Sequence, residues 1–215
     1  MKLLSDKNFK VDKGRKFGYL TKIMHLKPSK VVCPFASKGC MAACLNTAGH
    51  GAFSTVQNAR TNRTKFYLEN PNEFKACLKA EILKQKKTAE KLGLKLAIRL
   101  NGTSDLNWLS FIKSMPDIQF YDYTKNPHLM LMNHLPNYDL TFSMNEANEL
   151  IALKLLKEGK RIAVVFRNEL PETWNGFKVI DSDNSDLRFI EPHGVIVGLR
   201  AKGKAKKDKS GFVKE

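Results

Sequence analysis

Residues 94–105, LKLAIRLNGTSD, decide the fold, because an apolar run of strand length ends there in a polar turn that contains glycine. Residues 118–127 (IQFYDYTKNP) and 138–146 (YDLTFSMNE) repeat this pattern, and 161–166 (RIAVVF) and 195–199 (VIVGL) are further apolar runs. Strands that alternate with helices form right-handed βαβ units. The sequence therefore predicts an α/β protein with a mainly parallel sheet.

The remaining elements fit the same scheme. Residues 17–25 (FGYLTKIMH) predict a first strand. Apolar side chains at helical spacing predict helices over 54–70, 71–92, 106–115 and 146–158. We expect a single α/β domain, either a partial (β/α) barrel or an open, mainly parallel sheet. The expected parts of the chain are a basic N-terminal arm (1–16), the α/β domain (17–199) and a basic C-terminal tail (200–215).

Three of the four cysteines lie within residues 31–51, VVCPFASKGCMAACLNTAGHG, directly after the first predicted strand. Thiolates bind soft metals well, so Cys33, Cys40 and Cys44 are candidate ligands of one metal centre. Three cysteines suit an iron–sulfur cluster of the [4Fe–4S] type that leaves one iron open to a small ligand. The favoured interpretation is such a cluster.

Other interpretations of these cysteines stay open. Structural zinc needs four ligands, and the fourth would come from His25, His50 or Cys77. A redox-active or nucleophilic thiol and plain buried cysteines are further alternatives. Cys77 itself falls on the apolar face of the helix predicted over 71–92, where we expect a core residue.

The carboxyl ends of parallel strands share one edge of a sheet, so the cysteine loop should meet the turns that follow the next strands, including 143–145. Their hydroxyl, amide and carboxylate groups suit a polar ligand such as an amino acid or a ribose. Ser104 or Asp105 can instead cap the helix at 106–115. The candidate cofactor-binding residues are Asn101, Gly102, Thr103, Ser104, Asp105, Tyr123, Thr124 and Lys125.

Arg99 lies in the strand before the first of these turns. A buried arginine needs an acidic partner, and Asp105 and Asp122 are the candidates. No motif of a hydrolase, a nucleotide-binding loop or a dinucleotide-binding enzyme occurs, and the catalytic residues are unknown.

The net charge of +16 favours polyanionic partners. Basic residues concentrate in LRAKGKAKKDKSGFVKE at the C-terminus, for which a disordered, solubilising tail is the alternative. The candidate nucleic-acid-binding residues are Arg200, Lys202, Lys204, Lys206 and Lys207.

The N-terminus has no signal-peptide pattern, and no apolar run is long enough to cross a membrane. We therefore expect a cytoplasmic protein. In a reducing compartment, close cysteines favour metal or redox chemistry over disulfides.

Five segments carry a resemblance to known proteins. They are CPFASKGCMAACLNTAGHG (33–51), RLNGTSDLNW (99–108), FYDYTKNP (120–127), LPETWNGFKVIDSD (170–183) and GVIVGLRAKGKAKKD (194–208). Together they resemble a family of small phage- and prophage-encoded proteins with a C-x6-C-x3-C loop. The resemblance implies a phage origin and a bacterial host cell, but no reaction.

Three cysteines after the first strand of a (β/α) pattern are also distantly similar to the radical S-adenosylmethionine enzymes. Their usual spacing is C-x3-C-x2-C, so the loop here would be enlarged. This similarity implies a [4Fe–4S] cluster with S-adenosylmethionine as cofactor, and the charge suggests a nucleic acid or nucleotide substrate. The alternatives are a non-enzymatic, metal-stabilised phage protein that binds nucleic acid, and a protein that binds a host factor.

Overall fold

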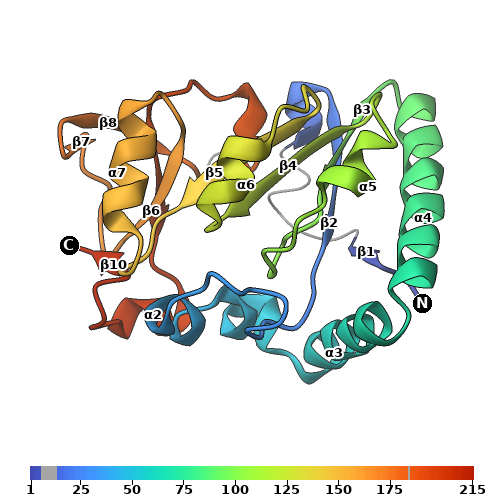
Figure 1. The fold of residues 1–215 in the computed structure, drawn as a ribbon, viewed down its shortest axis with the longest axis horizontal. Coiled ribbons are helices and arrows are strands. Elements are labelled where there is room, and N and C mark those ends of the chain that lie inside the picture. Colours follow the sequence, from blue (N-terminus) through green and yellow to red (C-terminus); the bar gives the residue numbers. More distant parts are fainter. Residues whose placement is uncertain (6–13, 184) are drawn as a thin grey trace.

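The computed structural model describes residues 1–5, 14–183 and 185–215, and these residues form one mixed sheet of ten strands (Figure 1). The strands are β1 (Leu4–Ser5), β2 (Tyr19–Met24), β3 (Lys95–Arg99), β4 (Gln119–Thr124), β5 (Tyr138–Ser143), β6 (Ile162–Phe166), β7 (Thr173–Trp174), β8 (Phe177–Asp181), β9 (Ile196–Arg200) and β10 (Val213–Lys214). The α-helices are α2 (Lys38–Ala42), α3 (Ser54–Glu69), α4 (Pro71–Lys91), α5 (Leu109–Lys113), α6 (Pro127–Met132) and α7 (Glu149–Lys157). Short 3-10 helices are η1 (Arg15–Phe17), η2 (Leu45–Thr47), η3 (Gly49–Ala52), η4 (Arg188–Ile190) and η5 (Gly203–Lys207).

Six parallel strands follow the order of the chain, β2-β3-β4-β5-β6-β9. A doubly wound sheet reverses its order at a switch point, and this run does not. The strand order is that of a (β/α) barrel, but the sheet is open, with β1 and β7 at its two ends. Both of these end strands pair antiparallel with their neighbours. The predicted open, mainly parallel sheet is confirmed.

One face of the sheet packs on helices. Phe74, Leu78 and Ile82 of α4 join Ile98 and Phe120 of the central strands in the main core. Pro71 occupies the first turn of α4, where its missing N–H costs nothing. Figure 1 shows α5, α6 and α7 in front of the strands. The predicted helices over 54–70 and 71–92 are confirmed, whereas the short helix expected at 106–115 begins only at Leu109.

On the opposite face of the sheet, which we call the inner face, lies a chain segment whose described residues are 182–183 and 185–191. Leu187 of this segment packs with Ala97 and Tyr121 of the sheet, and Phe189 contacts the rings of Tyr19 and Tyr121. This segment, which includes η4, therefore packs on the part of the inner face around Ala97 and Tyr121.

The loops after the parallel strands gather along one edge of the sheet, the lower edge in Figure 1. Here α2, α3 and the C-terminal residues lie below the strand ends. We call this edge the rim. It brings together the cysteine loop and the turns that follow β3, β4 and β5, as the sequence predicts.

The C-terminal residues 201–215 are folded onto the rim. β10 pairs parallel with the end of β6, and Val213 lies opposite Val165. Arg167 holds the segment because its guanidinium donates to the carbonyl oxygens of Lys206 and Asp208 at 2.8 Å each. The alternative of a disordered tail does not apply to this segment.

The N-terminal arm is described only in part. Leu4 and Ser5 form β1, while residues 6–13 lie outside the described residues. Across the described part of the chain, no helix combines the length and the apolar character that crossing a bilayer requires.

Candidate metal centre

The cysteine loop is tied to the turn that follows β3. The amide of Gly102 donates to the carbonyl oxygen of Met24, and the amide of Asp105 donates to that of Val32. A side chain at Gly102 would place its Cβ 2.5 Å from the Met24 oxygen, so only glycine fits this approach. The Sγ of Cys33 lies 3.7 Å from the carbonyl oxygen of Thr103 and donates to it.

The helix that carries Cys40 is held by the turn after β5. Ser37 caps α2 and accepts the amide of Cys40 at 3.1 Å. The carboxylate of Glu146 accepts the hydroxyl of Ser37 and the amide of Gly39, each at 2.7 Å. Glu146 thereby connects the turn after β5 to the cysteine loop.

The charge of Lys125 interacts with the three cysteines. Burial raises the pKa of Cys33 to about 12, and the nearby Lys125 opposes this shift. Burial also raises the pKa of Cys40, again against Lys125. Each of the three thiols also acts electrostatically on Lys125, and we call these four residues the thiol cluster. All three cysteines are free thiols.

Lys125 is a predicted rim residue that interacts with both Asp105 and the thiols. Its ammonium lies 3.9 Å from Asp105, whose side chain is fully buried. Burial would lower the pKa of Lys125, but Asp105 and the thiols outweigh burial and raise it. Lys125 is therefore a permanent positive charge next to three thiols. Thr124 donates to Asp105 at 2.7 Å and fixes this carboxylate.

Asn101, in the turn after β3, forms hydrogen bonds with its own neighbours in the chain. The side-chain oxygen of Asn101 accepts the Ser104 hydroxyl, the Leu106 amide and the Trp108 indole N–H. Neither Ser104 nor Asp105 caps α5, because the helix starts after Trp108 and the side-chain oxygen of Asn107 accepts the Leu109 amide there. These contacts show how the turn is built, and its place beside the cysteines is set by Gly102 and Asp105.

The thiols are not at metal-ligating separations. Within residues 1–5, 14–183 and 185–215, no three His, Cys, Asp or Glu side chains stand close enough together to hold an ion as placed. The donor set is nevertheless suitable, since three thiols on one loop share a positively charged neighbour. Cys77 is exposed on α4, so the prediction of a core cysteine there is wrong. It lies beside, and not on, the apolar row of Phe74 and Leu78.

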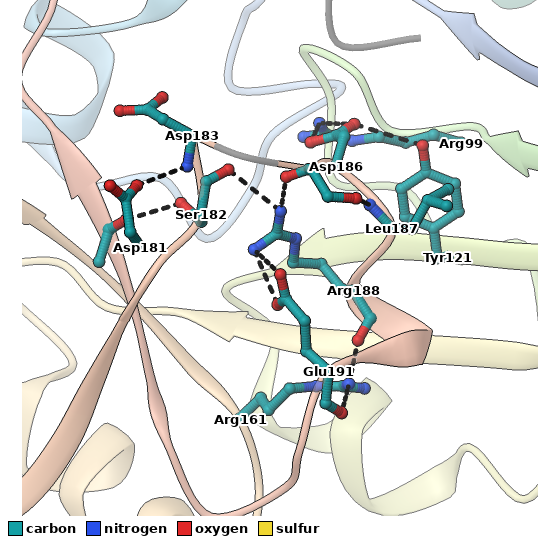
Figure 2. Close-up of polar contacts among 12 residues, drawn as sticks. Arg99, Tyr121, Arg161, Asp181, Ser182, Asp183, Asp186, Leu187, Arg188 and Glu191 are labelled. Atoms are coloured by element: carbon teal, nitrogen blue, oxygen red, sulfur yellow. Dashed lines mark hydrogen bonds and ion pairs between the residues drawn. The ribbon is translucent and has the colours of Figure 1, made fainter. Parts of the chain in front are cut away.

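A charged network lies on the inner face of the sheet (Figure 2). Asp186 bonds Arg99 at 3.3 Å and accepts the hydroxyl of Tyr121 at 3.3 Å. The guanidinium of Arg99 also lies 4.6 Å from the ring centre of Tyr123. The partner of Arg99 is therefore Asp186, and neither of the two aspartates that the sequence suggested.

Two further arginines anchor the same segment. Arg188 is fully buried, donating to the Glu191 carboxylate at 2.8 Å and to the Ser182 carbonyl oxygen at 3.2 Å. Arg161 pairs with Asp139 and donates to the Glu191 carbonyl oxygen. Figure 2 shows Arg188 enclosed between the two ends of the segment. The segment is thus locked by buried charges.

A second basic group lies at the end of β2. Burial lowers the pKa of His25 to about 3, and the charges of Arg60 and Arg99 add to this shift. His25 is therefore neutral at physiological pH. Arg60, whose guanidinium bonds the side chain of Asn46, interacts in turn with Cys44. His50 stacks on Phe53 instead.

The predicted nucleic-acid-binding residues fall into two groups. Arg200 bonds Asp181 at 3.0 Å and Asp183 at 3.1 Å, and Lys202 bonds Asp183 at 3.0 Å. The charges of these two residues are therefore balanced. Lys204, Lys206 and Lys207 are exposed on η5.

The sequence aligns with one described family. A family model, Gene product 88 (GP88), matches residues 2–215. The chain belongs to the Gene product 88 family. This match to a phage gene product family confirms the phage part of the resemblance over nearly the whole chain. No curated protein and no solved structure matches the chain.

Three contributors to the site were missed in the sequence. Glu146 and Asp186 act through partners more than 80 residues away, which no local pattern reveals. Arg60 lies on the helix predicted over 54–70, where the sequence assigns it no role. The one available signal was position, since Glu146 directly follows the polar turn after a predicted strand.

Proposed function

We propose that this protein is an iron–sulfur protein whose cluster, of the [4Fe–4S] type, is held by Cys33, Cys40 and Cys44. We propose further that it acts as an enzyme similar to the radical S-adenosylmethionine enzymes, on a nucleic acid or a nucleotide. The observation that carries the proposal is the position of the thiols. They follow the first of six sequentially ordered parallel strands, on a loop that is hydrogen-bonded to the turn after β3, and each interacts electrostatically with Lys125.

The chemistry of the thiols supports a soft metal. Because burial raises the pKa of Cys33 to about 12, this thiol keeps its proton at neutral pH. A metal ion that takes the place of the proton would bind Cys33 as a thiolate. Lys125 lowers the cost of the negative charge that three thiolates would bring. Structural zinc is the alternative, and it would need a fourth ligand in addition to the three cysteines.

Cys33, Cys40 and Cys44 would hold such a cluster, which would supply one-electron reduction of the sulfonium of S-adenosylmethionine, with an external reductant as the source of the electron. The chain's own residues serve this chemistry by position. Asp105 fixes Lys125, Gly102 allows the loop and turn to meet, and Glu146 holds the helix of Cys40. Tyr123, Thr124 and the turn at 101–105 remain the proposed contacts of the small ligand.

The experiment is a spectrum and a turnover assay on protein purified without oxygen. The proposal expects a brown protein, and loss of S-adenosylmethionine when dithionite is added. Variants with serine in place of Cys33, Cys40 or Cys44 should lose both properties, while Cys77→Ser should keep them.

The results separate the alternatives. A brown protein that leaves the sulfonium intact favours a structural cluster that pins the loop of a nucleic-acid-binding protein. A colourless protein that holds zinc at one equivalent overturns the cluster. A Cys77→Ser variant as pale as the others would also overturn it, since Cys77 lies outside the cysteine loop.

A further inference from the structure

A groove runs between α2 and the C-terminal segment. Its volume is about 420 Å³, and its floor is made of small residues such as Gly39, Ala42 and Ala43. Four lysines line it, namely Lys38, Lys204, Lys207 and Lys209. We call it the lysine groove. It lies outside the thiol cluster but shares the helix that carries Cys40.

The charge of the lysine groove is not balanced. All four lysines are exposed, and in the described part of the chain none of them forms an ion pair. The one acid in the lining is Asp208, whose carboxylate accepts the Ser210 hydroxyl at 2.7 Å and the Val213 amide at 3.2 Å. Asp208 therefore shapes the turn of the segment. By contrast, Arg200 and Lys202 form ion pairs with aspartates.

The groove is a built part of the fold. Ala43, Ala201, Ala205 and Phe212 form a small core beneath it, and Cys40 packs against this core. The position of the lysines thus depends on the same packing that places α2. A ligand in the groove lies against the residues that flank Cys40 in the chain.

We propose that the lysine groove binds the phosphodiester backbone of a nucleic acid, and that this strand is the substrate presented to the thiol cluster. The second half of this proposal rests on the proposed function, and the first half does not. Lysines are flexible point charges that neutralise successive phosphates. Because the lining contains no aromatic side chain to stack on bases, binding should depend little on sequence.

Two other occupants fit the lining less well. A membrane surface requires large apolar side chains that insert between lipids, and the lining has none. Interfaces between proteins are depleted in lysine and enriched in aromatic residues, which is the reverse of this groove. The net charge of +16 adds a long-range attraction for nucleic acid.

The test compares two quadruple variants by fluorescence anisotropy with a labelled single strand of mixed sequence. In the groove variant, Lys38, Lys204, Lys207 and Lys209 become Gln. In the matched control, four exposed lysines of α4 become Gln, namely Lys75, Lys84, Lys87 and Lys91. Both variants lose the same charge, so only the location of the charge differs.

Four phosphate contacts add about 3 to the steepness with which the logarithm of the affinity falls against the logarithm of the salt concentration. This corresponds to an affinity loss of about 50-fold between about 50 and 200 mM salt. The groove variant should lose this component and bind at least tenfold more weakly at low salt. The control should change affinity less than threefold and keep the slope. Equal losses in both variants, or none in either, would overturn the proposal, and so would tighter binding to anionic vesicles than to the strand.

Iron content measured on the same samples separates this proposal from the proposed function. Groove variants that keep their iron but lose the strand support the groove. Wild-type protein without iron that still binds the strand through the groove contradicts the cluster alone. Circular dichroism spectra equal to that of the wild type show that the variants are folded.

Discussion

Replacing Asp186 by Asn tests whether the buried network on the inner face holds residues 185–191 in place. Asp186 is the counter-ion of Arg99 and the acceptor of the Tyr121 hydroxyl. The side chains of Arg99 and Asp186 are only 17% and 8% exposed, so water cannot replace the lost charge. Burial raises the pKa of Tyr121 well above its usual value, so the hydroxyl cannot compensate by ionising.

The expected cost follows from the uncompensated cation. Removing one partner of a buried ion pair costs about 3–5 kcal/mol, because the remaining charge stays desolvated. The N–O distances of 3.3 and 3.4 Å are long, and Tyr123 keeps a cation–π contact with Arg99. We therefore expect the lower end, about 3 kcal/mol, or about 6–12 °C in Tm for a chain of this size.

The assay is urea denaturation of the wild type, Asp186→Asn and a control, Asp181→Asn. Asp181 pairs with Arg200 at the surface, where an ion pair contributes less than about 1 kcal/mol. A free energy of unfolding for Asp186→Asn within about 0.5 kcal/mol of the control would refute the reasoning. It would mean that the network does not hold the segment.

Other predictions concern the titration of a buried acid, the loop junction and the C-terminal segment. Burial raises the pKa of Asp122 to about 7, so the folded state retains a proton that the unfolded chain releases near pH 4. The free energy of unfolding should therefore fall as the pH rises from 5 to 7, by about 2–3 kcal/mol more in the wild type than in Asp122→Asn. A urea midpoint that changes equally between the two pH values in both proteins would contradict this. Gly102→Ala forces its Cβ against the Met24 oxygen and should cost about 1–3 kcal/mol in urea denaturation; a neutral effect would show that loop and turn are not in contact. Arg167→Met removes the donors to Lys206 and Asp208, so hydrogen exchange should rise in 203–215 while α4 stays protected; unchanged exchange in 203–215 would show that Arg167 does not hold the segment.

The main elements of the fold could be predicted because their signals are local. The strand at 94–100 and the helix with Phe74 and Leu78 show their periods directly in the sequence. A helix at α6 was missed because Asn126 and Pro127 were interpreted as a turn. In the structure Asn126 caps the helix and Pro127 occupies its first turn, both common at helix starts.

Short strands were harder to predict. The β7–β8 hairpin carries Asn175 and Gly176, both at positive φ, in its turn. This dipeptide is a strong hairpin signal that the sequence analysis left unused. β10 has two residues, and its pairing with β6 depends on Arg167, so no local pattern could have found it.

The candidate site was predictable in outline only. The topological rule for parallel strands brought the cysteine loop, Asp105 and Lys125 to one rim, as the structure shows. The partner of Arg99 could not be predicted, since Asp186 lies 87 residues away and is placed by packing of Leu187. Nor could the sequence predict that, among the described residues, Arg200 and Lys202 form ion pairs while Lys204 and Lys207 do not.

Iron and acid-labile sulfide, measured per chain after anaerobic purification, show whether Cys33, Cys40 and Cys44 hold an iron–sulfur cluster. We expect equal amounts of both elements in wild type and in Cys77→Ser, and neither above background once Cys33, Cys40 and Cys44 are all serine. Iron and sulfide retained in that triple variant, or zinc in place of both elements in wild type, would contradict it.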